Sequence, residues 1–451
     1  MFEIEIMKDF NNPESITQKD IFFFWLPLAL TWLMMSIEGP YLSALIARLP
    51  EAKINLAAYG ISFSLAMIFE APVIMMMSAS VALSKDYTSY LQLKKFNFRI
   101  NLLLTLLLIC FNIPTVFFFV TERLIGLPEN VSLLAHQSTI ALIPFPASIG
   151  FRRFYQGILI RNSKTKFIAL GTVVRLAAMS LTAFFLFLFG KISGALVGGI
   201  SLSAGVISEA IFVRVVCSSV LKRLKSEQNF SDLKEKQTNQ KIIFKFYFPL
   251  ALTSLLTIGI QPFVTFFVGQ SRMPLESFAV LPVITSFVFI FRAIGLSYQE
   301  VVVALIGNRF ENLKALSFFA LKVSLFLVLI LGSIAFSVLS DIWLKDISGL
   351  SEQLSNFSKL PLQIMSFFPA LTVLISFQRA VLVKSGNTKS ITLGTSIEFA
   401  TIVLLMLFFI HGTNFWGAIS ATIAFVMGRI FACLYLMIPS YFSIKTYAEK
   451  K

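Results

Sequence analysis

Charged side chains are scarce in this chain of 451 residues. They make up 14% of the sequence, whereas an ordinary soluble protein has about 25%. Apolar residues make up 57%, and phenylalanine alone occurs 49 times. A soluble fold of this length needs many more charges to cover its surface, so the composition excludes a soluble enzyme and a disordered protein. It predicts an all-α membrane protein that crosses the bilayer many times.

Residues that build metal sites and disulfide frameworks are also rare. The sequence has two histidines and three cysteines, and Cys110, Cys217 and Cys433 each lie within an apolar run. It contains neither a GxxxxGK[ST] phosphate-binding loop nor a recognisable catalytic triad. We therefore expect no metal site, no organic cofactor and no enzymatic activity. The net charge of +15 is not accompanied by a basic soluble module, so we expect no nucleic-acid partner.

Twelve stretches are long and apolar enough to cross a hydrocarbon layer about 30 Å thick. They cover residues 21–46, 54–81, 98–120, 131–158, 166–190, 194–220, 243–269, 277–306, 314–339, 356–383, 390–411 and 415–440. The two termini and the connecting segments on one side carry 23 Lys and Arg residues, and the connecting segments on the other side carry 7. Because basic loops stay in the cytoplasm, this asymmetry predicts that both termini are cytoplasmic.

The longest polar segment follows the sixth span and divides the chain into halves. We predict a cytoplasmic N-terminal segment, an N-lobe of six spans, a linker, a C-lobe of six spans and a cytoplasmic tail, at residues 1–20, 21–221, 222–242, 243–440 and 441–451. The halves repeat one another: Pro27–Thr31 recurs as Pro249–Thr253, and Gly194-Ala195 recurs as Gly417-Ala418. Six-span repeats share one orientation, which predicts two lobes around a central cavity.

Beyond the first four residues of each predicted span, which are counted with the loops, eight basic and five acidic residues fall inside the spans. A charge at this depth costs at least about 2.5–3.5 kcal/mol, so each needs a partner or water. Glu70 aligns with Arg292 in the repeat, and Arg175 aligns with Glu398. Two sets of ion pairs remain open, Glu70–Arg175 with Arg292–Glu398, or Glu70–Arg292 with Arg175–Glu398. The basic excess of the interior favours an anionic ligand over a cationic one.

Prolines mark candidate hinges within the spans. Pro40, Pro72 and Pro262 each remove a backbone donor from a predicted helix. Glu38 lies beside the first of these and is a candidate for proton or cation binding, together with Glu70 and Glu398 as coupling or gating residues. The C-lobe repeat keeps the proline but has Ile260 in place of the acid.

Four arginines are candidates for binding substrate charge. They are Arg153, Arg175, Arg292 and Arg379. Arg153 follows Arg152 near the predicted cytoplasmic end of the fourth span. These two side chains either form an entry site for an anion or extend to the lipid headgroups. Gln156 aligns with Arg379, so both lobes carry a base in this region.

The six-plus-six spans, the acid in a kinked first helix and the repeated Pro-Leu-Ala-Leu-Thr together resemble the multidrug and toxin extrusion (MATE)-like branch of the MOP exporter superfamily. Shorter motifs are similar to the progressive-ankylosis-protein family; they are Leu56–Gly60, Ser64-Leu65, Phe69, Pro72, Ser84–Asp86, Gly157–Arg161 and Gly171-Thr172. The resemblance implies a rocker-switch exporter. MATE members expel organic cations against Na⁺ or H⁺, and ankylosis-type members export anions.

The combined interpretation is a secondary active exporter of an organic or phosphorylated anion. Two alternatives remain open, a Na⁺- or H⁺-coupled multidrug antiporter for organic cations and a flippase for lipid-linked oligosaccharides. We expect a small anionic or amphiphilic substrate, contact with the lipid bilayer, and a plasma membrane location, which is the inner membrane if the source is bacterial. The sequence leaves the oligomeric state and the choice between Na⁺ and H⁺ open.

Overall fold

A computed structural model describes residues 16–449, apart from 85, 163, 165, 190–191, 227–239, 308 and 414. The helices of the N-terminal half are α2 (Gln18–Ser36), α3 (Glu38–Ile46), α4 (Ala52–Ile74), α5 (Met76–Leu83), α6 (Tyr87–Phe111), α7 (Pro114–Phe118), η1 (Phe119–Leu124), α8 (Glu129–Ala141), α9 (Phe145–Arg161), α10 (Lys166–Phe189) and α11 (Gly194–Ser226). This part of the chain is helical at every predicted span.

The C-terminal half repeats this order, with one long helix in place of α4 and α5. Its helices are α12 (Gln240–Ile258), α13 (Ile260–Gly269), α14 (Pro274–Leu305), α15 (Leu313–Ala335), α16 (Leu339–Asp341), η3 (Ile342–Ile347), α17 (Glu352–Met365), α18 (Phe368–Lys384), α19 (Thr388–Gly412) and α20 (Gly417–Glu449). The bounds of α2 recur in α12 at the offset of 222, and those of α9 and α11 recur in α18 and α20 at 223. The register read from short sequence motifs is therefore present in the helix ends.

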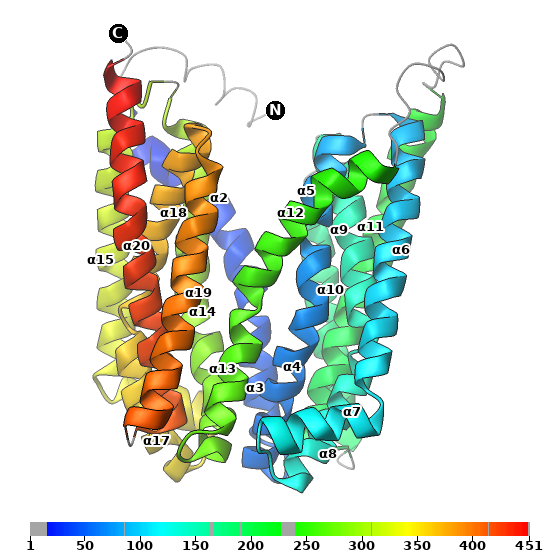
Figure 1. Ribbon diagram of the computed structural model, residues 1–451, viewed down its shortest axis with the longest axis vertical. Helices are drawn as coiled ribbons and strands as arrows, with labels where there is room; N and C mark the ends of the chain where they lie inside the picture. Colours follow the sequence, from blue (N-terminus) through cyan, green and yellow to red (C-terminus); the bar gives the residue numbers. More distant parts are fainter. Residues whose placement is uncertain are drawn as a thin grey trace.

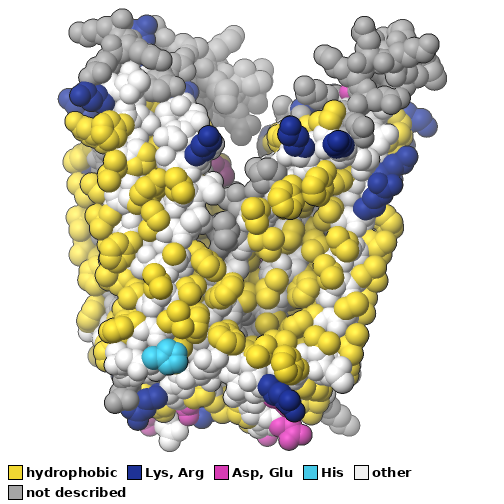
Figure 2. Space-filling view, in the orientation of Figure 1, with side chains coloured by type: hydrophobic (Ala, Val, Ile, Leu, Met, Phe, Trp, Pro, Cys, Tyr) yellow, Lys and Arg dark blue, Asp and Glu magenta, His cyan; other side chains and the backbone are white. Residues whose placement is uncertain are grey.

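The chain is an integral membrane protein. Within the described residues, nine helices are long and apolar enough to cross a bilayer, or ten if α6 with α7 and η1, which are bent by 72°, form one span. The remaining predicted spans, 131–158 and 243–269, are also helical, but each is divided into two helices. Figure 2 shows hydrophobic side chains over the middle of the visible face and Lys and Arg side chains nearer its two ends.

Two helical bundles lie side by side and diverge toward the end where α2 begins and α20 ends (Figure 1). The surface between them is hollowed at that end (Figure 2). Residues 1–15 of the predicted N-terminal segment, 227–239 of the predicted linker and 450–451 of the predicted tail lie outside the described residues. Helix α11 extends into the predicted linker as far as Ser226, and α20 extends into the predicted tail as far as Glu449.

The first span of each half is broken at the same repeat position. Helix α2 ends before Ile37 and α12 ends before Gly259, three residues ahead of Pro40 and Pro262. A proline lacks the N–H that a helix interior needs but is tolerated in the first turn, so each proline lies where a new helix has just begun. The break associated with Pro72 comes instead at Met75, three residues after it.

The two broken spans cross between the lobes. The Trp25 indole of α2 donates a hydrogen bond to Ser297 Oγ of α14 at 2.9 Å. Conversely, α12 of the C-lobe contacts the N-lobe. The Tyr247 hydroxyl of α12 donates a hydrogen bond to the carbonyl oxygen of Pro72 at 2.5 Å, and α12 packs against α4, α5 and α6. Near the diverging end, the beginning of each lobe's first span therefore lies on the other lobe (Figure 1).

The opposite end of the molecule is sealed by close contacts between the lobes. Lys53 Nζ of α4 lies 2.7 Å from Glu276 Oε1 of α14. Glycine allows the backbones to approach: a Cβ on Gly60 would lie 2.4 Å from Cγ of Pro282, and one on Gly39 would lie 2.7 Å from Cβ of Ser286. The lobes thus touch here with no space for a larger side chain.

We expect Gly60→Val to open this sealed end, because the added carbons conflict with the rigid Pro282 ring. Overpacking of about 1–3 kcal/mol changes the ratio of two conformations about 5- to 150-fold. Distances between spin labels at the exposed residues Glu129 and Leu339, with Cys110 replaced by serine, measure the change. Gly332→Val is the matched control, since nothing lies within 4 Å of its Cβ position. An unchanged distance distribution in Gly60→Val contradicts the prediction.

Candidate functional site

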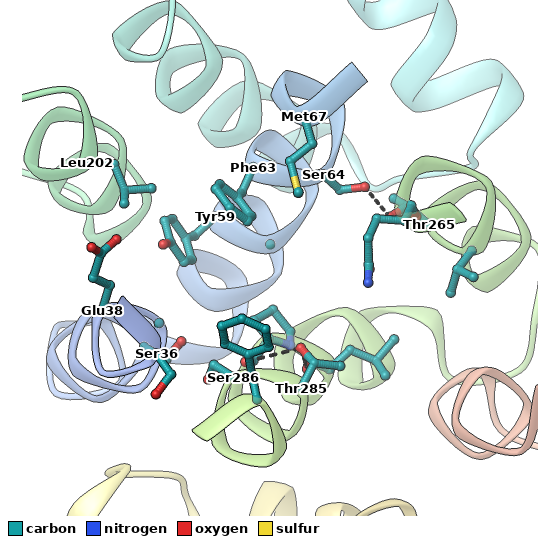
Figure 3. Close-up of a pocket in the computed structure, with 18 of the residues that line it drawn as sticks. Ser36, Glu38, Tyr59, Phe63, Ser64, Met67, Leu202, Thr265, Thr285 and Ser286 are labelled. Carbon is teal, nitrogen blue, oxygen red and sulfur yellow. Dashed lines mark hydrogen bonds between the residues drawn. The ribbon is translucent and has the colours of Figure 1, made fainter. Parts of the chain in front are cut away.

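A cavity of about 420 Å³ lies between the lobes. Its walls come from α2, α3, α4, α9, α10 and α11 on one side and from α13, α14 and α20 on the other. In Figure 3, Glu38 and Tyr59 lie on one side of this space, and Thr285 and Ser286 lie on another. The site is therefore shared by the two halves of the chain.

Most of the cavity wall is apolar. Its larger hydrophobic residues are Met35, Phe63, Met67, Phe145, Leu202, Val264, Phe278, Leu281, Phe289 and Phe425. A few hydroxyl groups make parts of the wall polar. Ser64 Oγ lies 2.8 Å from Thr265 Oγ1 across the boundary between the lobes, and the Thr285 hydroxyl donates a hydrogen bond to the Leu281 carbonyl oxygen. Such a wall suits a ligand with an apolar body and few polar groups.

The N-lobe charges form a connected network. Arg175 Nη2 lies 2.5 Å from Glu38 Oε2, and its Nη1 lies 3.9 Å from Glu209 Oε2. Glu209 also accepts hydrogen bonds from Arg152 at 2.5 Å and from Gln156 at 3.0 Å. Helices α3, α9, α10 and α11 supply these side chains. Each of these two carboxylates therefore faces at least one arginine, as burial away from water requires.

The C-lobe charges lie around a second cavity of about 130 Å³, and Glu398 is the one acid among its lining residues. Arg429 Nε donates to Glu398 Oε1 at 2.8 Å, and Arg379 Nη2 donates to Thr395 Oγ1 at 3.1 Å. Arg292 lines this cavity as well as the central one. Three guanidinium groups share one carboxylate around the second cavity, which leaves a surplus of two positive charges.

Glu70 and Arg292 occupy equivalent repeat positions, and both line the central cavity. Within the described residues, neither side chain has an ion-pair or hydrogen-bond partner. The guanidinium carbon of Arg292 lies 4.5 Å from the ring centre of Phe368. An aromatic face stabilises a cation only in part, so Arg292 retains capacity for an anionic ligand.

The ion pairs differ from both sets that the sequence left open. Arg175 pairs with Glu38 and Glu209, and not with Glu70 or Glu398. Glu398 pairs with Arg429. The cross-lobe set fails because equivalent positions of a repeat belong to different lobes. The within-lobe set fails because the acids nearest to Arg175 come from α3 and α11, and the arginine nearest to Glu398 comes from α20.

Six of the seven charged candidates line the two cavities. Glu38, Glu70, Arg175 and Arg292 line the central cavity, and Arg292, Arg379 and Glu398 line the second. Arg153 lines neither, and its Nη1 lies 3.8 Å from the Met77 sulfur. The roles assigned to these residues, and to Pro40, Pro72 and Pro262 as hinges, stay predictions.

The sequence-based set omitted four members of the two charge groups. They are Arg152, Gln156, Glu209 and Arg429. Their mid-span position is the signal that could have found them, because a polar group at that depth needs a partner. Among the described residues, no group of three or more His, Cys, Asp or Glu side chains is placed to hold a metal ion.

Neither a protein-family model nor a curated protein matches this sequence, but solved structures share its fold. An inward-facing multidrug resistance MATE family transporter of the MOP superfamily superposes with a TM-score of 0.66 at 15% identity, over 93% of this chain and 96% of that one. The lipid II flippase MurJ, in an inward closed conformation, gives 0.67 at 15% identity, over 94% and 90%.

A third structure is a MOP superfamily transporter from Pyrococcus furiosus, described by the reverse polarity of its binding pocket. It gives a TM-score of 0.64 at 16% identity, over 97% of this chain and 98% of that one. The chain thus has the fold of the MATE-like transporters of the MOP superfamily. The narrower likeness to the progressive-ankylosis-protein family stays a prediction from the sequence.

We expect Glu38→Gln and Arg175→Gln to destabilise the protein by about 3–5 kcal/mol each, because each leaves a poorly hydrated charge without its main partner. The double variant should lose less than the sum of the two, since no orphaned charge remains at this pair. Thermal unfolding of the purified variants measures these differences. Additive losses would show that the pair contributes no coupling.

Proposed function

We propose that this chain is a secondary exporter that moves an organic or phosphorylated anion by alternating access. One observation carries the proposal: Arg292 lines the cavity between the lobes without an acidic partner among the described residues, and together with Arg379 it gives the adjoining second cavity a surplus of two positive charges. Holding such charge away from water is costly unless an anion compensates it. The second cavity, with this positive surplus, attracts anions and repels cations.

The shape of the molecule supports alternating access. The cavity lies between lobes that diverge at one end and touch at the other (Figures 1 and 2). The predicted topology assigns the diverging end to the cytoplasm, so this conformation would receive substrate from inside. Export then requires the Lys53–Glu276 contact and the Gly60–Pro282 contact to separate.

Coupling is assigned to the glutamates. Glu38 and Glu398 are engaged by arginines, so they act as gates only when those ion pairs open. Glu70 has no such partner among the described residues and lines the cavity, which makes it the candidate for binding H⁺ or Na⁺. The coupling ion stays open between these two.

Two other functions have an observation in their favour. The free carboxyl group of Glu70 in an aromatic-lined cavity favours a cation antiporter. The shared fold of MurJ favours a flippase for a lipid-linked substrate. The anion exporter is preferred because the uncompensated charges of the two cavities are predominantly positive.

Counterflow in proteoliposomes tests the proposal. Vesicles loaded with pyrophosphate, ATP, citrate or an organic cation dye are assayed with and without pH and Na⁺ gradients. We expect saturable anion exchange that falls at least tenfold in Arg292→Gln, because the free guanidinium group is lost. Lys322→Gln, an exposed position on α15, should leave exchange unchanged.

The same assay separates the alternatives. Dye movement that depends on a gradient and is lost in Glu70→Gln, with Arg292→Gln unaffected, would contradict the anion proposal in favour of a cation antiporter. Transport of a lipid-linked sugar, with no exchange of the soluble anions, would contradict it in favour of a flippase.

A further inference from the structure

The second cavity lies inside the C-lobe, between α14, α18, α19 and α20. We propose that it binds the head of the transported molecule, a compact oxyanion with two negative charges, while the apolar body of that molecule lies in the central cavity. This inference rests on the proposed function, because it assigns a place and a charge to the exported anion.

The charge balance sets the charge of the head. The arginines of this cavity are Arg292, Arg379 and Arg429, and its acid is Glu398. Glu398 accepts a hydrogen bond from Arg429, and Arg379 donates to a threonine hydroxyl and has no acidic partner among the described residues. A doubly charged oxyanion neutralises the remaining surplus of two, which neither a neutral group nor a single carboxylate does.

The hydrogen-bonding groups also remain open. The Nε atoms of Arg292 and Arg379 are buried and have no hydrogen-bond partner within the described structure. An unsatisfied charged donor costs more than a neutral one, and hydrogen bonds from guanidinium to oxyanions are among the strongest in proteins. The site therefore offers buried donors that an oxyanion would satisfy.

An aromatic ring holds two of the guanidinium groups in place. The Phe368 ring centre lies 4.5 Å from the guanidinium carbon of Arg292 and 4.9 Å from that of Arg429. These contacts fix the positions of the two cations before a ligand arrives, despite their mutual repulsion. Preorganisation of this kind lowers the cost of binding.

The two cavities share one wall. Gln261, Thr285, Arg292 and Phe425 line both of them. A ligand can therefore place its head among the arginines and its body along the apolar residues of the larger space. The small volume, about 130 Å³ against about 420 Å³, limits the head to a compact group.

The N-lobe offers no equivalent site. At its matching positions, Glu70 replaces Arg292, Gln156 replaces Arg379 and Val206 replaces Arg429. Its arginines Arg152 and Arg175 are already engaged by acids, and Arg153 lines neither cavity. The anion site therefore belongs to the C-lobe alone.

The test compares three ligands with one body and different heads on the full-length protein in lipid nanodiscs. Naphthyl phosphate, naphthoate and naphthol carry two, one and no negative charges, and calorimetry measures their dissociation constants. We expect the phosphate ester to bind at least tenfold more tightly than naphthoate, and naphthol to bind most weakly. Inorganic phosphate should displace the ester and leave naphthol bound.

Variants assign the binding to this cavity. Arg379→Gln should weaken the phosphate ester at least tenfold without changing naphthol, and Arg379→Lys should recover part of the loss. Glu398→Gln should tighten the ester, since it removes the competing carboxylate. The control is Arg214→Gln, a change within α11 that lines neither cavity. Thermal unfolding without ligand verifies that each variant is folded.

Equal affinities for the ester, naphthoate and naphthol in the unchanged protein would overturn the inference without any variant. So would an ester affinity that Arg379→Gln leaves unchanged. Anion counterflow that persists in a folded Arg379→Gln variant would retain the exporter and overturn this site. Tight ester binding lost in Arg379→Gln, with no counterflow of any anion, would retain the site and overturn the exporter.

Discussion

The cost of holding ionised side chains away from water organises this molecule. A charge in the hydrocarbon layer is stable only beside an opposite charge, a strong hydrogen-bond partner or water. In the N-lobe, Arg152, Arg175, Glu38 and Glu209 meet this condition among themselves, although Glu70 has no such partner among the described residues. In the C-lobe, three arginines and one acid line the second cavity, and only Arg429 of these arginines is paired with Glu398. The two lobes share a backbone plan and differ in electrostatics.

Duplication explains how this difference arose on a common framework. The helix ends recur at offsets of 222 and 223, so the two lobes present the same positions to the space between them. Changes at those positions reverse the charge, as at Glu70 and Arg292, or remove it, as at Glu38 and Ile260. A repeated fold therefore does not imply a repeated site. One half can retain a balanced network while the other acquires a ligand-binding surface.

Sequence patterns were sufficient for the spans and the repeat, because both follow from long apolar runs and recurring motifs. They were not sufficient for the ion pairs. The repeat alignment suggested a pair between Glu70 and Arg292, but these equivalent positions belong to different lobes. The observed ion pairs join neighbouring helices of one lobe. Such contacts depend on helix rotation and packing, which hydropathy does not encode. The exchange of α2 and α12 between lobes had no signal beyond the prolines that follow their breaks.

That exchange has a mechanical consequence. Each broken span is attached to both lobes, so in the proposed alternating access a rotation of one lobe against the other would be concentrated in a few backbone dihedrals at Ile37 and Gly259. These residues would then act as paired fulcrums, with displacement growing with distance from them. Glu38 adjoins one of them and would move least, whereas the Lys53–Glu276 contact lies farther away and would move most. Chemistry placed at a fulcrum keeps its geometry while the passage around it opens and closes.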